Sequence, residues 1–366
     1  MEPFVYQPIS TRVIFGRGAV GRIKDEAERL GARRALVLST PGRGEALARQ
    51  VAGLLGERSA GIHAGAVMHT PVEATERALK VVMDRSADAV IAVGGGSTTG
   101  LGKAIALRTD LPQIVLPTTY AGSEVTPVLG ETQGGVKTTQ KSPKILPEVV
   151  IYDVDLTMEL PVPVAATSGM NAIAHAVEAL YAKDGNPIAS LMAEEGIAAF
   201  ARALPRLAEG PAQIEPRSEA LYGAWLCGQV LGMVGMALHH KLCHVLGGAF
   251  DLPHAQTHSV LLPHSAAYNA PAAPEAMARA ARGLGADDAP KALFDLAGRL
   301  GAKRSLRELG MPEGGIERAV EITMAAPYWN PRPLEPVAIR NLLVRAWNGE
   351  PPDSRRKRVV PKSGGH

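Results

Sequence analysis

The chain has few cysteines and few aromatic residues. Its 366 residues include two cysteines, Cys227 and Cys243, and aromatic residues make up 4% of the sequence. Two isolated cysteines in apolar segments exclude a disulfide framework and a paired-cysteine metal site. They indicate buried, reduced thiols, which are usual in the cytoplasm. We therefore expect a cytoplasmic protein held together by its hydrophobic core.

Long apolar runs and basic faces are also missing. No apolar run is long enough to span a bilayer, and the first residues, MEPF, do not begin a signal sequence. The net charge is only +3 at pH 7, and the one basic run, at 355–358, lies in a tail with proline and glycine. We therefore expect neither a membrane nor a nucleic acid as partner.

The first part of the chain alternates between short apolar runs and helical patterns. Strands are expected at 12–16, 34–39, 63–68, 89–93, 113–116 and 149–153, with a hairpin over 129–140 whose tip is Gly134-Gly135. Helical spacing is present at 18–30, 44–55 and 72–86. This alternation predicts βαβ units and a parallel sheet.

After residue 155 the pattern becomes helical. Helices are expected at 163–182, 188–204, 216–238, 275–283, 289–301, 315–324 and 335–346. The length of the chain favours two domains. We predict a Rossmann-like, dinucleotide-binding α/β domain over 1–160, an all-α substrate and catalytic domain over 161–350, and a flexible basic tail over 351–366.

A glycine-rich loop follows the strand at 89–93. Gly94, Gly95, Gly96 and Ser97 open the next helix, where backbone N–H groups and the helix dipole can bind a pyrophosphate. The loop lacks the Gly-x-Gly-x-x-Gly spacing, and Lys103 lacks the setting of a phosphate-binding Walker lysine. A second polar loop, 117–126, follows the next strand, so both loops lie at the edge where open α/β sheets bind ligands.

The histidines are concentrated in the helical part. His240 and His244 are four residues apart and share a helical face, which Gly247-Gly248 can end, and Pro253 marks a turn before His254. Asn171 and His175 form a second pair at the same spacing. Such a constellation suits zinc or iron(II), although Asn171 is a much poorer ligand than a carboxylate. Histidines at this spacing can also be buried core residues or surface residues.

With these motifs the chain resembles the iron-containing alcohol dehydrogenase superfamily, whose fold also includes dehydroquinate synthase-like proteins. The resemblance runs from the first strand to about residue 347. Metal-dependent members have aspartate and histidine at the positions of Asn171 and His175, and their other ligands match His240 and His254. His244 matches a further histidine of the cleft. In this family Gly94–Ser97 would bind the pyrophosphate, and Lys137 stands where a lysine often binds the nucleotide.

Three departures point to the maleylacetate reductase subgroup. Asn171 replaces the ligand aspartate, Gly100 replaces an acidic residue, and the loop at 118–123 is one residue shorter and carries Tyr120. The segments 168–171, 239–244 and 328–333 also resemble that subgroup. The resemblance implies reduction by NADH or NADPH of the carbon–carbon double bond of maleylacetate to 3-oxoadipate, during aromatic compound degradation, in a homodimer.

The resemblance assigns roles to particular residues. The catalytic candidates are Asn171, His175, His240, His244, His254 and Tyr120, with His244 as proton donor and no required metal. The cofactor candidates are Ser39, Gly94, Gly95, Gly96, Ser97, Thr118, Thr119, Ser123 and Lys137. No carboxylate follows the strand at 34–39 to repel a 2′-phosphate, and Arg43 can attract one, so both cofactors are expected.

The dicarboxylate substrate requires cationic or donor groups. Arg332 and Tyr120 are the substrate-binding candidates, although Arg332 between two prolines fits loop architecture equally well, and Tyr120 can simply pack. Lys241 points away from His240 on the helix and is expected in solvent. The alternatives are a metal-dependent alcohol dehydrogenase, a dehydroquinate synthase-like lyase, and a nucleotide- or metal-binding protein with a decayed site.

Overall fold

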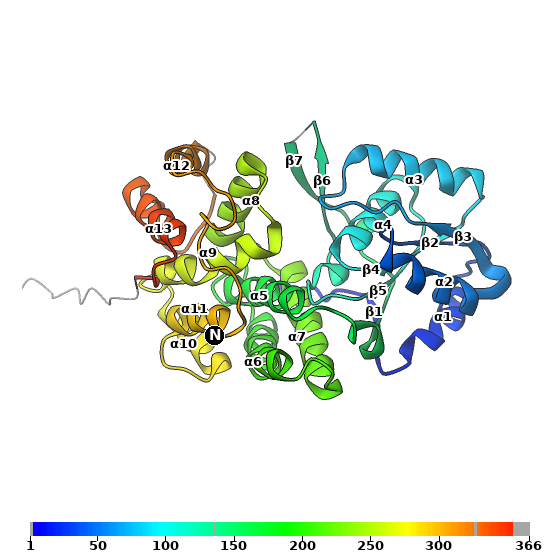
Figure 1. Cartoon of the computed structure of the whole chain (residues 1–366), viewed down its shortest axis with the longest axis horizontal. Coiled ribbons are helices and arrows are strands. Elements are labelled where there is room, and N and C mark those ends of the chain that lie inside the picture. The colour runs from blue at the N-terminus through cyan, green and yellow to red at the C-terminus, as the bar shows by residue number, and fades with distance from the viewer. Residues whose placement is uncertain (1–2, 135, 326–327, 354–366) are drawn as a thin grey trace, which may run out of the picture.

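The computed structural model describes residues 3–134, 136–325 and 328–353. A parallel sheet with flanking helices forms the N-terminal half, and helices alone form the C-terminal half (Figure 1). These two architectures confirm the predicted fold class. Most of the predicted tail, residues 354–366, lies outside the described residues.

The main sheet has the strand order β1-β8-β5-β4-β2-β3, and every pairing in it is parallel. Its strands are β1 (Arg12–Gly16), β2 (Ala35–Leu38), β3 (Ser59–His63), β4 (Ala89–Gly94), β5 (Gln113–Pro117) and β8 (Val149–Asp153). The third strand was expected at 63–68, but it ends at His63 because Val67 and Met68 are exposed rather than buried in the sheet. Successive strands are added to one side of β2 up to β3 and to its other side from β4 onward, and open parallel sheets bind ligands at the carboxyl ends of the strands at such a point.

Both faces of the sheet are covered. One face carries α1 (Ile23–Arg29) and α2 (Arg43–Leu55), and the other carries α3 (Val72–Asp84) and α4 (Gly96–Thr109). In β2, Val37 packs with the first pair of helices and Leu36 and Leu38 with the second. Burial on both faces explains the continuous apolar runs, and each such side chain contributes about 1.5–3 kcal/mol.

The helical half contains a helix at each of the seven places where the sequence predicts one, together with α8 and α9. Its helices are α5 (Val162–Ala179), α6 (Pro187–Glu209), α7 (Ile214–Met233), α8 (Leu238–Phe250), α9 (His254–Asn269), α10 (Pro274–Leu284), α11 (Ala289–Arg299), α12 (Gly315–Ala325) and α13 (Pro336–Asn348).

Short 3-10 helices lie earlier in the chain. They are η1 (Ala19–Arg22), η2 (Gly56–Arg58), η3 (Ser123–Val125), η4 (Pro143–Ile145) and η5 (Val154–Thr157).

Two predictions about these helices were wrong, and one helix was not predicted. The helix expected over 216–238 ends at Met233, and the chain then bends by 95° into α8. Helix α8 continues through Gly247-Gly248 and ends at Asp251, which adopts a left-handed conformation with φ 53°. Helix α9 was not predicted, because it contains Pro263 and is buried on several sides, so its sequence has no clear apolar face.

The predicted hairpin is present and reaches toward the helical half. It consists of β6 (Val128–Gln133) and β7 (Val136–Lys141), which pair antiparallel. Figure 1 shows it above the sheet, on the side that faces α8. Within the described residues, no single helix has the length and apolar composition to cross a membrane, whereas α7 and α8 taken together pass that test on these two criteria alone.

Candidate active site

The glycine-rich loop has the geometry of a pyrophosphate site. It follows β4, and α4 begins at Gly96 with no side chain capping its first turn. A Cβ at Gly95 would lie 2.9 Å from the Thr119 Cγ2 atom, whereas one at Gly96 would meet no atom within 4 Å. The loop is therefore packed on one side and open on the side where a phosphate can approach the backbone N–H groups.

The other cofactor candidates surround this loop. The Thr118 N–H donates to the Gly94 carbonyl at 3.0 Å, which ties the end of β5 to the end of β4. Ser39 is fully buried at the end of β2, and Arg43 is exposed at the start of α2. Ser97 is in the first turn of α4. The side chain of Lys137 lies outside the described part of the chain.

Lys103 connects the glycine-rich helix to the second polar loop. Its Nζ atom donates to the Ser123 carbonyl at 2.6 Å, to the Thr126 carbonyl at 2.7 Å and to the Val128 carbonyl at 3.0 Å. Burial lowers the pKa of Lys103 to about 7, and the nearby Glu124 carboxylate opposes that shift. The carbonyl acceptors also favour the charged amine. Sequence reasoning left Lys103 without a role, but the structure makes it the tether between the two loops.

The histidines come together from three helices of the other half. His175 is on α5, His239, His240 and His244 are on α8, and His254 and His258 are on α9. Ring centroids are 4.9 Å apart for His175 and His240, 6.5 Å for His244 and His254, and 4.4 Å for His254 and His258. The predicted convergence of the imidazoles is therefore present.

The cluster touches the second polar loop of the N-terminal half. The Ala121 carbonyl lies 3.3 Å from the His175 Nε2 atom and 3.5 Å from the Asn171 amide nitrogen. Ala121 follows β5, whose neighbour β4 carries the glycine-rich loop. The imidazoles and the cofactor candidates therefore belong to one site at the carboxyl edge of the sheet.

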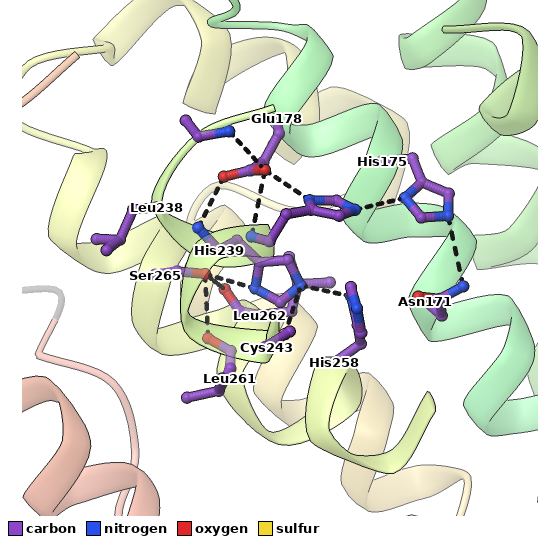
Figure 2. A network of polar contacts seen from close by, with 12 residues as sticks. Asn171, His175, Glu178, Leu238, His239, Cys243, His258, Leu261, Leu262 and Ser265 are labelled. Atoms are coloured by element: carbon purple, nitrogen blue, oxygen red, sulfur yellow. Dashed lines mark hydrogen bonds and ion pairs between the residues drawn. The ribbon is translucent and has the colours of Figure 1, made fainter. Parts of the chain in front are cut away.

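Glu178 anchors the cluster, as Figure 2 shows. Its carboxylate accepts from the backbone N–H groups of Ala237 and His239, at 2.9 and 2.8 Å, at the start of α8. It also accepts from His240 Nδ1 at 2.6 Å. Burial acts to raise the pKa of Glu178, but the His240 hydrogen bond and the backbone donors outweigh it and lower the pKa to about 2. This carboxylate therefore both caps a helix and fixes the orientation of a ring.

A directed chain of hydrogen bonds starts from Glu178. Glu178 accepts the Nδ1 proton of His240, and His240 Nε2 lies 2.8 Å from His175 Nδ1, so these two ring nitrogens share one proton. The Asn171 amide nitrogen lies 3.4 Å from His175 Nε2 and donates to the Ala121 carbonyl at 3.5 Å, and the same carbonyl lies 3.3 Å from His175 Nε2. Burial, with the neighbouring His240, holds the pKa of His175 well below its ordinary value. An aspartate at position 171 could not donate to the Ala121 carbonyl.

A second group of side chains lies behind this chain. His239 Nε2 is 2.9 Å from His258 Nδ1 and 3.7 Å from the Cys243 sulfur, and His239 Nδ1 contacts the Ser265 hydroxyl at 3.0 Å. Burial lowers the pKa of His239 to about 3 and holds that of His258 well below its ordinary value. These neutral, mutually hydrogen-bonded rings support the inner wall of the site.

A cavity of about 320 Å³ opens beside the imidazoles. His244, Gly248 and His254 line it from the helical half, and His69 and Thr132 line it from the N-terminal half. His244 is exposed and His254 is half-buried, unlike the fully buried rings behind them. The predicted proton donor His244 therefore lies where a substrate can reach it.

The two substrate-binding predictions do not fit the structure. The Tyr120 ring is fully buried against Phe200, near Thr157 and Arg217, and burial raises the pKa of its hydroxyl. It packs in the helical core rather than at the cavity. Arg332 lies 4.2 Å from the centre of the Tyr268 ring and donates to the Tyr268 carbonyl at 3.2 Å, so its role is in loop architecture.

Other residues were missed or misplaced by sequence reasoning. Lys241 was expected in solvent, but it is half-buried and lies 5.5 Å from the centre of the Tyr328 ring. Glu178 and His239 were overlooked. The three-residue spacing of Glu178 from His175, on one helical face, was the available signal. His69 carried no signal, because only the fold brings its loop to the histidines.

Comparisons with known proteins agree with this geometry. Residues 10–154 match the family model described as iron-containing alcohol dehydrogenase, and residues 165–347 match that of the Fe-containing alcohol dehydrogenase family, C-terminal. The chain belongs to the iron-containing alcohol dehydrogenase family.

The proteins most like this chain within the family include maleylacetate reductases. The maleylacetate reductase of Rhizobium sp. (strain MTP-10005) is 56% identical over 96% of this chain and 100% of its own length. The crystal structure of maleylacetate reductase from Agrobacterium tumefaciens is 56% identical, with a TM-score of 0.93 over 96% of this chain and all of that one. A 1,3-propanediol oxidoreductase structure is 27% identical, with a TM-score of 0.89 over 94% of this chain and 100% of its own. The match therefore extends through both halves.

The ligand positions of the family do not fit a divalent metal as they stand. They hold three imidazoles and the neutral Asn171, without a carboxylate to balance the charge of the ion. His175 Nδ1 and His240 Nε2 also face each other at hydrogen-bond distance, so their shared proton occupies the direction of a metal bond. His239, Cys243 and His258 offer ligand atoms within 4.8 Å of one another, but the imidazoles of His239 and His258 are likewise joined by a hydrogen bond.

Proposed function

We propose that the chain is a maleylacetate reductase, which reduces the carbon–carbon double bond of maleylacetate to give 3-oxoadipate in the degradation of aromatic compounds. The observation that carries this proposal is the 56% identity to a maleylacetate reductase along that protein's whole length. The clustered imidazoles at the edge of the nucleotide-binding sheet support the same chemistry.

The N-terminal half holds the reduced nicotinamide cofactor, which supplies the hydride. The open face of Gly96 and the uncapped start of α4 suit the pyrophosphate, and Thr118, Thr119 and Ser123 line the adjoining loop. We expect NADH and NADPH to be accepted, since exposed Arg43 follows β2 and can attract a 2′-phosphate. A strict preference for NADH, with no measurable NADPH turnover, contradicts this expectation.

The helical half stabilises the charge that develops on the substrate. Hydride addition to the alkene carbon remote from the ketone places negative charge on the keto oxygen, as an enolate. Imidazole N–H groups directed at that oxygen lower the barrier in the way that an oxyanion hole does. His244 is at the cavity and donates the proton to the carbon next to the ketone. The buried chain from Glu178 keeps the neighbouring rings in fixed tautomers.

We further propose that the reaction needs no metal. The Asn171 amide nitrogen lies 3.4 Å from His175 Nε2, the atom that a metal ion would otherwise bind. A pocket without the aspartate is also less negative, which suits a dicarboxylate substrate. The chain then keeps the fold of the family, and hydrogen-bond donors stabilise the enolate in place of a metal ion.

One assay tests these proposals together. The loss of NADH absorbance with maleylacetate is measured before and after chelation, along with the metal content per chain, and primary alcohols with NAD serve as the comparison. Activity with maleylacetate that survives chelation is expected. Activity that disappears with the metal and returns on its addition contradicts the metal-free reading, and turnover of alcohols alone supports a metal-dependent alcohol dehydrogenase instead.

The family resemblance also supports a homodimer that acts in the cytoplasm. Light scattering coupled to size-exclusion chromatography tests the oligomeric state, with a mass of about twice 38.4 kDa expected for the dimer. Both cysteines, Cys227 and Cys243, are buried and unbridged, which agrees with a reducing compartment.

A further inference from the structure

The cavity beside the imidazoles is short of strong cations. Among the described residues that line it there is no lysine or arginine; the basic side chains on its walls are histidines, and Asp251 adds one carboxylate. His244 and His254 belong to the helical wall, and His69 belongs to the opposite wall. If the substrate is a dicarboxylate, as the proposed function requires, its negative charge must be met mainly by imidazoles and backbone N–H groups.

The helical wall already has two sources of positive potential. His254 begins α9, whose first turn has no side-chain cap, so its N–H groups and dipole favour an anion nearby. His244 lies next to it, with ring centroids 6.5 Å apart. A substrate with carboxylates at both ends needs a further donor on the other wall, and His69 is the basic residue described there.

The backbone at His69 is held in an unfavourable conformation. His69 and Thr70 have φ values of 64° and 47°, in the left-handed region that residues other than glycine rarely adopt. Strain of this kind persists only where the surroundings impose it, and it is common at ligand sites. Here the hairpin imposes it, because the Thr132 N–H donates to the Thr70 carbonyl at 3.2 Å and the Thr132 hydroxyl to the His69 carbonyl at 3.2 Å.

Gly100 makes room for this loop. A Cβ at Gly100 would lie 2.3 Å from the Thr70 hydroxyl oxygen, so no larger residue fits while Thr70 keeps its place. Thr70 is buried, whereas His69 is half-buried at the cavity. The glycine-rich helix, the strained loop and the hairpin therefore pack together in a way that presents the His69 side chain to the cavity.

We propose that His69 is a substrate-binding residue, which donates a hydrogen bond to one carboxylate of the dicarboxylate substrate from the wall opposite His244 and His254. This inference rests on the proposed function and adds a specificity-determining residue to it. His69 thus takes the part that sequence reasoning gave to Arg332.

Two variants of His69 test the proposal. His69→Gly removes the imidazole and relieves the left-handed backbone, and His69→Asn keeps a donor on a residue type that tolerates that conformation. Ser86→Gly is the matched control, since Ser86 also has a left-handed φ, 47°, after α3 and is not among the residues lining the cavity. Initial rates with maleylacetate give kcat and KM, and fluorescence titration gives the Kd for NADH.

For His69→Gly we expect the KM for maleylacetate to rise about tenfold or more, the usual effect of losing a hydrogen bond to a charged group. The kcat and the Kd for NADH should stay within about twofold of the wild type, and His69→Asn should be intermediate. The monocarboxylate 4-oxopent-2-enoate, which keeps the enone and the neighbouring carboxylate, identifies the group bound. If its KM is unaffected by His69→Gly, His69 binds the distal carboxylate, and if its KM also rises, His69 binds the carboxylate beside the alkene.

The outcomes separate this inference from the proposed function. A wild-type chain that does not oxidise NADH with maleylacetate overturns the proposed function, and the His69 role with it. An active wild type whose KM is unchanged in His69→Gly overturns the His69 role alone. Parallel losses in kcat, NADH affinity and thermal stability, absent from Ser86→Gly, also overturn it, because they indicate that His69 only supports the fold.

Discussion

The two halves of the site recognise their partners by different means. In the proposed cofactor site, the glycine-rich loop offers backbone N–H groups at the start of α4, and the absence of side chains at Gly95 and Gly96 leaves room for the pyrophosphate. The imidazole cluster uses side chains from α5, α8 and α9, joined by hydrogen bonds that Glu178 directs. Binding at the glycine-rich loop therefore depends on open space beside the backbone, and binding at the imidazole cluster depends on how the rings are oriented.

This difference predicts different sensitivities. A backbone site tolerates changes of charge around it but not an added methyl group. A buried side-chain network tolerates small changes in volume but not the loss of one partner, because the remaining groups stay desolvated. Variants in each half can show whether this contrast holds.

The largest effect is expected from Glu178. Glu178→Ala leaves the start of α8 and His240 without their acceptor, and should lower the free energy of unfolding by about 3 kcal/mol. Glu178→Gln keeps the size but not the charge, and should lower kcat by about 10- to 100-fold. Urea unfolding and initial rates measure these effects. Glu195→Gln, at a surface ion pair with Arg202, is the control, and a Glu178→Gln enzyme with the kcat of the wild type would contradict the role.

The next effect tests the open face of the glycine-rich loop. Gly96→Ala introduces a Cβ that meets no protein atom, so the free energy of unfolding should not fall. The methyl group should instead obstruct the pyrophosphate and raise the Kd for NADH by about tenfold or more, the equivalent of about 1.4 kcal/mol. The control is Gly53→Ala in α2, which also meets nothing within 4 Å. Equal NADH affinity for both variants would show that the cofactor does not approach Gly96.

Gly100 tests how the glycine-rich helix α4 packs against the loop of His69 and Thr70. Gly100→Ala forces Thr70 aside, and such overpacking typically costs about 1–3 kcal/mol. Thr70→Gly removes the obstructing hydroxyl, so the double variant should recover most of that loss. Thermal unfolding of both single variants and the double variant measures the coupling. Strictly additive effects would mean that the two residues do not contact each other in solution.

The smallest effect concerns His264, which is buried outside the network. Burial lowers its pKa to about 4, and both ring nitrogens lack a hydrogen-bond partner among the described residues. In the unfolded chain His264 takes up a proton below about pH 6.5, whereas in the folded chain it stays neutral down to about pH 4. The free energy of unfolding is therefore highest above pH 6.5 and falls between pH 6.5 and 4, by at most about 1.4 kcal/mol per pH unit. His264→Leu should reduce this slope in urea unfolding at pH 7.5 and pH 5. An unchanged slope would contradict the assignment.

Sequence reasoning succeeded where the evidence is local. The glycine-rich loop, the hairpin and the i,i+4 pairs at Asn171 and His240 are contiguous, so their spacing predicts both structure and position. It failed where tertiary packing decides. Tyr120 belongs to the second polar loop, but its side chain packs in the helical core. Helix α9 has no amphipathic pattern because it is buried on several sides.

Long-range contacts explain the remaining omissions. Glu178 is 62 residues from His240, and His69 meets the helical half only across the cavity. No property of either segment alone reveals such a partner. The resemblance to a family supplied the ligand positions, but it supplied neither the carboxylate behind them nor the loop opposite them.

The buried amine of Lys103 has a consequence for protein engineering. It joins α4 to the carbonyls of residues 123, 126 and 128, so the glycine-rich turn before α4 and the start of the hairpin are held together. A designer who grafts a new cofactor loop after β5 would need to preserve those three acceptors, or else exchange the lysine as well. Because these acceptors are backbone carbonyls, libraries that vary the side chains at a fixed loop length should keep them, whereas insertions or deletions in the loop should leave the buried amine without its acceptors.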